Sequence, residues 1–304
     1  MKEVLKIRNL SKKFNGHLVI NSLNATIYEG DVFGFLGPNG AGKTTTIKMI
    51  LGLIKCNSGE IYINGINAME NYKEAIRNVS AIVETPKFYE NLCAYDNLKI
   101  IKNFYKEIPE SRIIEVLEIV NLDKYLNKKI KYFSLGMKQR LGIASALLSN
   151  PRIILLDEPS NGLDPQEIIE IRQLIKRLAE DEKVTFFICS HLLHEIELLC
   201  NRVAIISNGS IAIQGKVKDL LDNSKNIYEF RVSDKNKSKE ITENFQGVTF
   251  DSFTHKGMIV ELLDKKSWEL NKEFVMNDIQ VSAIHKIGKS LEEYFIETVE
   301  GIEI

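Results

Sequence analysis

The sequence has no long hydrophobic run. Hydrophobic residues make up 44% of its 304 residues, but no run approaches the roughly 20 apolar residues that a helix needs to cross a bilayer. Residues 1–6 interrupt their apolar side chains with charges, unlike the hydrophobic centre of a signal peptide. We therefore expect a cytoplasmic protein without a membrane-spanning segment of its own.

The sequence also lacks an excess of one charge, and it has no cysteine motif. Lys and Arg number 40 and Asp and Glu number 41, so the whole chain offers no electrostatic attraction for nucleic acid, and we expect no such partner. The four cysteines form no C-x-x-C pair and no metal-ligand spacing; they are Cys56, Cys93, Cys189 and Cys200. We predict four reduced, buried structural thiols.

Short apolar runs alternate with longer amphipathic segments from residue 3 to about 215. This alternation is typical of an α/β domain in which helices cover a sheet. The runs 32–36, 153–156 and 184–188 are almost continuously apolar, so they predict central strands that are buried on both faces.

Two other patterns surround this predicted parallel core. Segments 4–8 and 23–27 alternate apolar with polar residues, and the turn signals Asn64-Gly65 and Asn208-Gly209 follow strand-like segments, which together predict an antiparallel β portion. The stretch from about 86 to 150 has little strand character, and its apolar residues recur at helical spacing. We therefore predict a helical insertion there.

The remainder of the chain predicts a second, smaller domain. We place the boundary at 221/222, so that residues 222–304 form an accessory α+β domain. The predicted order is strand 226–232, helix 236–244, strand 248–253, strand 257–263, helix 265–276, strand 279–287 and helix 290–299. That order resembles the split βαβ plan.

The sequence Gly37-x-x-x-x-Gly42-Lys43-Thr44 follows the apolar strand 32–36 and precedes a segment, 44–53, with helical spacing. In this context it predicts a phosphate-binding loop, because glycines turn backbone N–H groups toward one concavity and a helix N-terminus favours anions. Lys43 would contact the β- and γ-phosphates and Thr44 would ligate Mg²⁺. The predicted nucleotide-binding residues here are Gly37, Asn39, Gly40, Ala41, Gly42, Lys43, Thr44 and Thr45.

Two adjacent carboxylates, Asp157 and Glu158, follow the predicted strand 153–156. A carboxylate at a strand end can hold Mg²⁺, and its neighbour can orient or deprotonate the attacking water. We assign Asp157 to the metal and Glu158 to the water. The phosphate loop alone would serve a kinase, a GTPase, a helicase or a transporter ATPase equally well.

Further motifs select among these classes. The segments Phe133-Ser134-Leu135-Gly136-Met137-Lys138-Gln139-Arg140 and Asp157-Glu158-Pro159-Ser160-Asn161-Gly162-Leu163-Asp164 resemble those of the ATP-binding-cassette (ABC) ATPases. The resemblance covers about residues 3–220 and implies an α/β P-loop NTPase fold of ABC type. Residues 1–221 would be the nucleotide-binding domain, with a helical subdomain at about 86–150.

The resemblance also implies roles for single residues. Ser134 and Gly136 would contact the γ-phosphate of ATP held by the other subunit, although Leu135 and Met137 depart from the usual Leu-Ser-Gly-Gly-Gln pattern. Asp164 would communicate across the dimer. His191 would sense the γ-phosphate, and Phe14 would stack on adenine; a structural histidine and a core phenylalanine are the alternatives.

Glu84, in Ile82-Val83-Glu84-Thr85-Pro86, stands where the family usually has Gln at the hinge into the helical insertion. A carboxylate there brings a further negative charge toward Mg²⁺, so we count Glu84 among the catalytic and metal-binding candidates. This residue and the C-terminal Ser290-Leu291-Glu292-Glu293-Tyr294-Phe295 narrow the resemblance to bacitracin-resistance and lantibiotic-immunity ATPases.

That resemblance implies an ATPase that energises export or membrane removal of antimicrobial peptides. It would use ATP and Mg²⁺, form a head-to-tail homodimer around two ATP molecules, and sit on the inner face of the membrane beside a separately encoded permease. The alternatives are a transporter for another drug or lipid, a non-transport ABC protein acting on ribosomes or DNA repair, and a protein that binds ATP without turnover.

Overall fold

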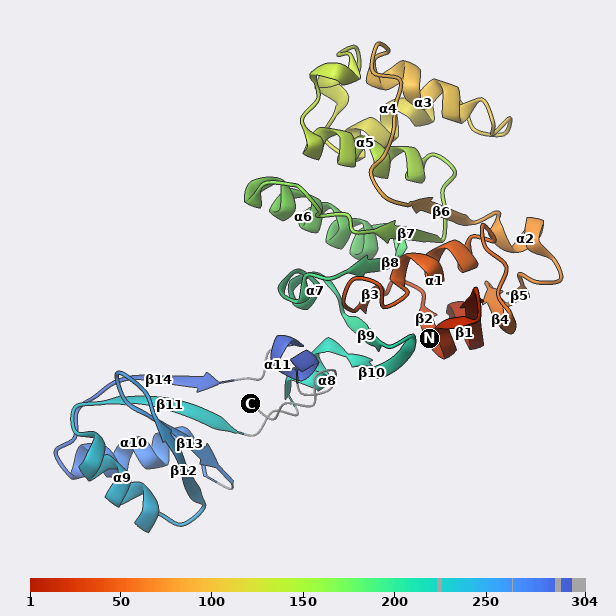
Figure 1. Ribbon diagram of the computed structural model, residues 1–304. Coiled ribbons are helices and arrows are strands. Elements are labelled where there is room, and N and C mark those ends of the chain that lie inside the picture. Colours follow the sequence, from red (N-terminus) through yellow and green to blue (C-terminus); the bar gives the residue numbers. More distant parts are fainter. Residues whose placement is uncertain (223–225, 264, 288–290, 297–304) are drawn as a thin grey trace. The chain divides into compact units, whose positions relative to one another are not determined.

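The computed structural model describes residues 1–222, 226–263, 265–287 and 291–296 (Figure 1). The chain folds into two compact units, the first spanning Met1–Val217 and the second beginning at Lys218. Each unit has its own sheet structure and its own hydrophobic core.

A six-stranded sheet forms the centre of the first unit, in the order β10-β9-β3-β8-β7-β6. Neighbouring strands are parallel except for the antiparallel pair β9 and β10. The strands are β3 (Val32–Leu36), β6 (Val79–Ile82), β7 (Ile153–Asp157), β8 (Thr185–Ser190), β9 (Arg202–Ser207) and β10 (Ser210–Lys216). All residues of β3, β7 and β8 are buried, which confirms the three predicted central strands.

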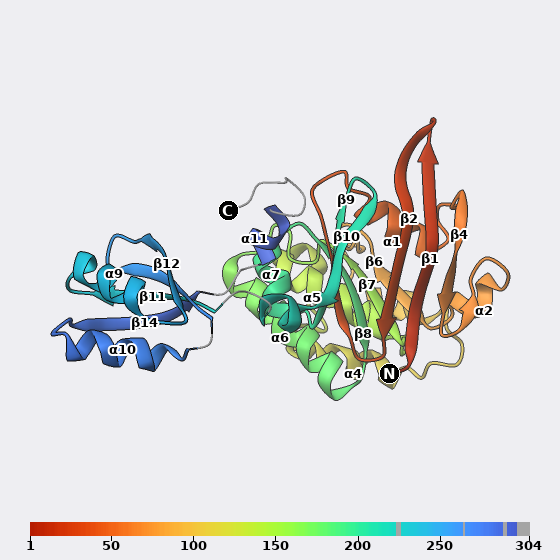
Figure 2. The same cartoon turned by 90° about the horizontal axis from the view of Figure 1, so that it is seen from below.

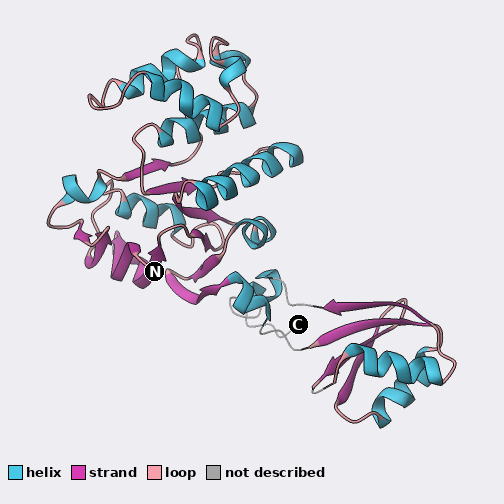
Figure 3. Ribbon diagram, turned by 180° about the vertical axis from the view of Figure 1, so that it is seen from behind, coloured by secondary structure: helices cyan, strands magenta, loops and turns pink. Residues whose placement is uncertain are grey.

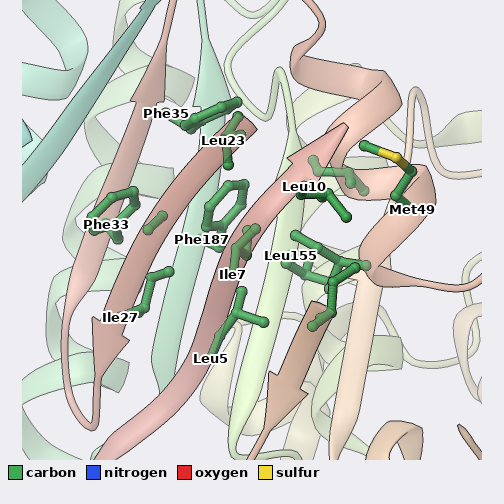
Figure 4. Close-up of a cluster of buried hydrophobic side chains, with 14 of the residues drawn as sticks. Leu5, Ile7, Leu10, Leu23, Ile27, Phe33, Phe35, Met49, Leu155 and Phe187 are labelled. Carbon is green, nitrogen blue, oxygen red and sulfur yellow. The ribbon is translucent and has the colours of Figure 1, made fainter. Parts of the chain in front are cut away.

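A second, antiparallel sheet has the order β2-β1-β4-β5. Figure 2 shows β2, β1 and β4 side by side. Its strands are β1 (Glu3–Phe14), β2 (His17–Tyr28), β4 (Ser58–Ile63) and β5 (Ile66–Asn67). β1 and β2 run beyond the predicted 4–8 and 23–27, because irregularities at left-handed Asn9 and Ser22 (φ 45° and 48°) interrupt the alternation without ending the pairing. The apolar side chains of this sheet pack against Phe33, Phe35 and Phe187 of the parallel sheet (Figure 4).

Both predicted tight turns are present. Asn64 and Gly65 have φ of 52° and 81°, and Asn208 and Gly209 have 48° and 77°. Positive φ at both central residues is the geometry that closes two-residue hairpins.

Helices complete the first unit. They are α1 (Lys43–Ile50), α2 (Tyr72–Ile76), α3 (Ala94–Lys102), α4 (Ser111–Ile119), α5 (Leu135–Leu147), α6 (Pro165–Asp181) and α7 (Leu193–Leu199), with 3₁₀ turns at Asp123–Tyr125 and Ile130–Tyr132. Helix α8 (Val217–Asp222) begins at the last residue of this unit and continues into the second. Helices α3, α4 and α5 contact one another and gather beyond β6, against which α5 packs, which confirms the helical insertion (Figure 3). α1 ends at Ile50 rather than near Leu53, because Gly52 adopts a left-handed φ of 65°.

The second unit contains a four-stranded antiparallel sheet in the order β12-β13-β11-β14. Its elements are β11 (Ile227–Val232), α9 (Lys235–Asn244), β12 (Val248–Phe253), β13 (Met258–Leu262), α10 (Ser267–Met276), β14 (Val281–Ile287) and α11 (Leu291–Phe295). This is the split βαβ order expected from the sequence. Of the predicted last helix, residues 290 and 297–299 lie outside the described residues.

The prediction for the cysteines is half wrong. Cys189 and Cys200 are buried as expected, and burial raises the pKa of both thiols. Cys56 and Cys93 are only half-buried. Cys93 is the N-cap of α3, where its Sγ accepts a hydrogen bond from the Asp96 backbone N–H at 3.4 Å. A helix cap lies at the surface, so this cysteine has a polar partner instead of an apolar site.

Candidate nucleotide site

The ends of four parallel strands assemble the candidate site. β3, β8, β7 and β6 are consecutive neighbours in the sheet, so their carboxyl ends share one edge. The loop 37–42 follows β3, His191 follows β8, Asp157 ends β7 and Glu84 lies just after β6. Segments far apart in sequence therefore meet because of sheet order.

The glycines of the phosphate loop are required by its backbone and by its neighbours. Gly40 and Gly42 have φ of 84° and 105°, which residues with a Cβ rarely adopt. A Cβ on Gly42 would lie 2.3 Å from Ile20 Cδ1, and one on Gly37 would lie 2.5 Å from the Ile206 carbonyl oxygen. The loop is thus held tightly between β2 and β9 at the start of α1.

Lys43 places a buried cation at the centre of this loop. Its side chain is 6% exposed, and Nζ donates hydrogen bonds to the carbonyl oxygens of Gly37 (2.8 Å) and Pro38 (3.3 Å). Nζ also lies 3.5 Å from Glu158 Oε1. A flexible ammonium held by carbonyl oxygens can exchange them for phosphate oxygens with little rearrangement.

Thr44 and Asp157 form a pair suited to a divalent cation. Thr44 Oγ1 donates to Asp157 Oδ2 at 2.8 Å. Asp157 is 4% exposed, and its Oδ1 accepts no hydrogen bond from any described residue. Burial raises the pKa of Asp157, and the hydrogen bond from Thr44 opposes that rise. A buried, unpartnered carboxylate oxygen beside a hydroxyl is the donor set that Mg²⁺ uses next to nucleotide phosphates.

These two residues cannot complete the coordination alone. Over the described ranges, no group of three or more His, Cys, Asp or Glu side chains is arranged to hold a metal. Mg²⁺ keeps several waters and bridges phosphate oxygens in such sites, so a pair of protein ligands is the expected number.

Glu158 is held in a strained position between two partners. Its φ of 50° is left-handed, a conformation that costs about 1–3 kcal/mol for a residue other than glycine. Its backbone N–H donates to the Cys189 carbonyl at 2.9 Å. Its Oε2 lies 2.8 Å from His191 Nδ1, and its Oε1 faces Lys43. The predicted Lys43, Thr44, Asp157, Glu158 and His191 therefore come together in one cluster.

The structure brings Glu84 to a different partner. Its side chain is 72% exposed and its Oε1 lies 3.7 Å from Nζ of Lys48 on α1. Lys48 follows Thr44 by one helical turn. Burial raises the pKa of Asp157, and the charge of Lys48 opposes that rise only slightly. Lys48 was missed in the sequence, although its i+4 spacing from Thr44 is visible there.

The residues predicted to face a second subunit also lie apart from this cluster. Ser134 is the N-cap of α5, and its Oγ accepts from the Met137 backbone N–H at 3.2 Å. Asp164 is the N-cap of α6 and accepts from the Glu167 N–H at 2.8 Å. Glu167 in turn accepts a hydrogen bond from Ser134 Oγ at 2.7 Å. Glu167 was also missed, although the Asp164-x-x-Glu167 spacing is typical of a helix start.

Phe14 lies near the β1–β2 turn rather than in the core. It is 43% exposed, and Lys12 Nζ lies 4.9 Å from its ring centroid. Its exposure excludes the core alternative and leaves ring surface for stacking. Of the other loop residues, Asn39 is exposed and Thr45 is half-buried.

The parallel sheet, the phosphate loop at its edge and the paired carboxylates define a P-loop nucleotide-hydrolysing ATPase. The family model of the ABC transporters matches residues 20–161. The chain is 43% identical to the bacitracin transport ATP-binding protein of Bacillus licheniformis, over 99% of each chain. It therefore belongs to the ATP-binding subunits of ABC transporters, which hydrolyse ATP to drive transport, act with membrane permease subunits and form dimers.

Two other similarities differ in extent. The lantibiotic transport ATP-binding protein of Streptococcus pyogenes is 39% identical, but the match covers 74% of this chain and 95% of that one. A solved dimeric ATP-binding cassette in a post-hydrolysis state with ADP and phosphate is 27% identical, with a TM-score of 0.61 over 70% of this chain and 98% of that chain. Among the described residues, no helix is long and apolar enough to span a bilayer.

Proposed function

We propose that this protein energises the export or membrane removal of a bacitracin-type antimicrobial peptide. The observation that carries the proposal is the alignment with the bacitracin transport ATP-binding protein, which extends over 99% of both chains. The match with the lantibiotic relative covers only 74% of this chain, which is about the length of the nucleotide-binding domain without the second unit. The second unit therefore favours the bacitracin type over the lantibiotic type.

The site supports a head-to-tail homodimer around two ATP molecules. Residues 1–221 would act as the nucleotide-binding domain, with Phe14 stacking on adenine and the loop Gly37–Thr44 holding the phosphates. Ser134 and Gly136 lie at the N-terminus of α5, where backbone N–H groups attract anions. That surface would meet the γ-phosphate of the partner subunit's ATP, and Asp164 would link the two sites.

The hydrolytic step follows from the cluster around Glu158. Thr44 and Asp157 would hold Mg²⁺, which neutralises phosphate charge when bound. Glu158 accepts a proton from the attacking water while the water oxygen bonds to the γ-phosphorus. The bond between the γ-phosphorus and the oxygen that bridges it to the β-phosphate breaks at the same time. His191, 2.8 Å from Glu158, fixes the direction of that carboxylate.

A cavity beside Glu84 suits contact with a separately encoded permease. It has a volume of about 600 Å³ and is lined by β6, residues 83–88 and parts of α3 and α5. Pro86 packs close over Gly142 of α5, where a Cβ would lie 2.7 Å from Pro86 Cγ. Movement of the hinge at Glu84 would therefore be passed to the helical insertion. We infer a cytoplasmic protein on the inner face of the membrane beside that permease, with residues 222–304 as an accessory domain.

Peptide sensitivity tests the proposal. A strain that lacks this gene should become at least about tenfold more sensitive to bacitracin, with little change for lantibiotics or unrelated drugs. The intact gene should restore resistance, and the Glu158→Gln variant, expressed at equal level, should not. Restoration by that variant would show that resistance does not need hydrolysis. If the strain instead became sensitive to a different drug or to lipid stress, the proposed substrate would be wrong, but the protein would still be assigned as an ATPase.

A further inference from the structure

The carboxylate of Glu167 covers the N-terminus of α5. Its Oε1 accepts a hydrogen bond from Ser134 Oγ at 2.7 Å. A Cβ built on Gly136 would lie 2.4 Å from Glu167 Cδ and 2.5 Å from Oε1. The carboxyl group therefore rests against the Gly136 backbone, where the proposed head-to-tail dimer would place a phosphate of the partner subunit's ATP.

The backbone of Glu167 is fixed by a contact within α6 and not by α5. Asp164 caps α6 by accepting a hydrogen bond from the Glu167 backbone N–H. This bond fixes the backbone of Glu167, which is the third residue of the helix. The rest of its side chain is free to rotate about single bonds while that cap persists. The backbone anchor and the carboxylate contact can thus separate without unwinding α6.

A carboxylate and a phosphate oxygen compete for the same partners at such a position. Both are anions, both accept from a hydroxyl, and both are stabilised by the exposed N–H groups at a helix N-terminus. They also repel each other at close range. We propose that Glu167 is an internal anion that occupies the position for the partner subunit's γ-phosphate in the single subunit and must leave before the dimer closes.

This assignment rests on the proposed head-to-tail dimer and adds a threshold to it. Closure has to break the Ser134–Glu167 hydrogen bond in each subunit, which raises the ATP concentration that closure needs. Glu167 is a positioning residue that acts through Ser134.

The test is ATP-dependent dimerisation of the full-length chain with the Glu158→Gln substitution, which slows hydrolysis. Sedimentation velocity would measure the ATP concentration at half-dimerisation with and without Glu167→Gln, which removes the charge but keeps the shape. We expect the concentration to fall about tenfold, the fold-change typical of losing one charge-assisted hydrogen bond. ATP binding by the monomer should not change, because Lys43 and Thr44 are untouched.

Glu170→Gln provides the matched control. Glu170 lies on the same helix and pairs with Arg140 at 3.7 Å, away from Ser134. Its loss should leave the ATP concentration for dimerisation unchanged, whereas Glu167→Ala should lower it as Glu167→Gln does. An unchanged or higher concentration for the Glu167 variants would overturn the competition. A Glu158→Gln protein that never dimerises with ATP would reject the head-to-tail dimer and this inference together.

Discussion

Two carboxylates, one in each unit, are treated by the fold in opposite ways. Asp157 of the first unit has a buried oxygen that no described residue satisfies, and burial raises its pKa. Glu229 of the second unit accepts from Thr254 (2.9 Å) and Arg231 (3.2 Å), and these hydrogen bonds, Thr254 first, lower its pKa. The charge of Asp157 destabilises the protein in the absence of a ligand, because one of its oxygens has no partner among the described residues. Both oxygens of Glu229 accept hydrogen bonds.

The difference indicates what each unit is built for. Buried polar groups normally have partners, so an exception marks a position where a ligand supplies the partner. In the first unit, Glu158 adds backbone strain beside that exception. In the second unit, Phe230 and Phe274 pack edge to face in a core that the surface charges do not enter. Substitutions in the two units should therefore differ in whether they change hydrolysis or only stability.

The largest effect is expected at Glu158. Its replacement by Gln removes the base but keeps the shape, so turnover should fall by about 10³-fold while ATP binding persists. ATP should then trap a dimer. Steady-state phosphate release and sedimentation with ATP measure both. Phosphate release at the parent rate would remove Glu158 from the catalytic role.

Asp157→Asn should separate function from stability. Loss of the metal carboxylate should lower turnover by at least about 100-fold. Without nucleotide the variant should melt about 2 °C higher, because the cost of burying a charge disappears. Because the pKa of Asp157 is raised, the parent carboxyl becomes protonated and gains stability as pH falls, so the difference in Tm should shrink in acid. A lower Tm for the variant at neutral pH would contradict the orphaned-charge interpretation.

Features that depend on local sequence pattern or on strand order could be predicted from the sequence. The phosphate loop, Asp157 and Glu158 follow apolar strands, and parallel strand ends must share an edge, so their meeting could be predicted. The order of elements in the second unit also followed from periodicity and turn signals.

Contacts between side chains of distant elements could not be predicted. Glu167 and Lys48 are ordinary helix residues in sequence, and only the packing of α6 on α5 and of the hinge beside α1 gives them Ser134 and Glu84 as partners. The bulged length of β1 was missed for the same reason, since it depends on pairing with β2. The cap at Cys93 is local, because its partner Asp96 is three residues further on, and it was missed because cysteine is not a usual N-cap residue.

A smaller effect is expected at the hinge. Glu84 is exposed and its charge is opposed by Lys48, so Glu84→Gln should change the Mg²⁺ concentration for half-maximal hydrolysis by only about threefold and weaken resistance. Lys48→Gln should shift the same Mg²⁺ dependence in the opposite direction, because it leaves Glu84 unopposed. A double variant that behaves as the sum of the two would show that the pair does not interact.

The smallest effect should come from Glu229, and it completes the contrast. Because partners lower its pKa, its ionised form stabilises the fold above the pKa that the unfolded chain has, and this contribution is lost as pH falls. Glu229→Gln should therefore lower Tm by about 1 °C at neutral pH, and the difference from the parent should shrink as pH falls through the pKa of the folded protein. ATP hydrolysis should remain at the parent rate, in contrast with Asp157→Asn. Calorimetry across pH, with phosphate release as the second readout, measures both. A loss of hydrolysis with unchanged Tm would show that the second unit takes part in the chemistry and that the satisfied carboxylate is not merely structural.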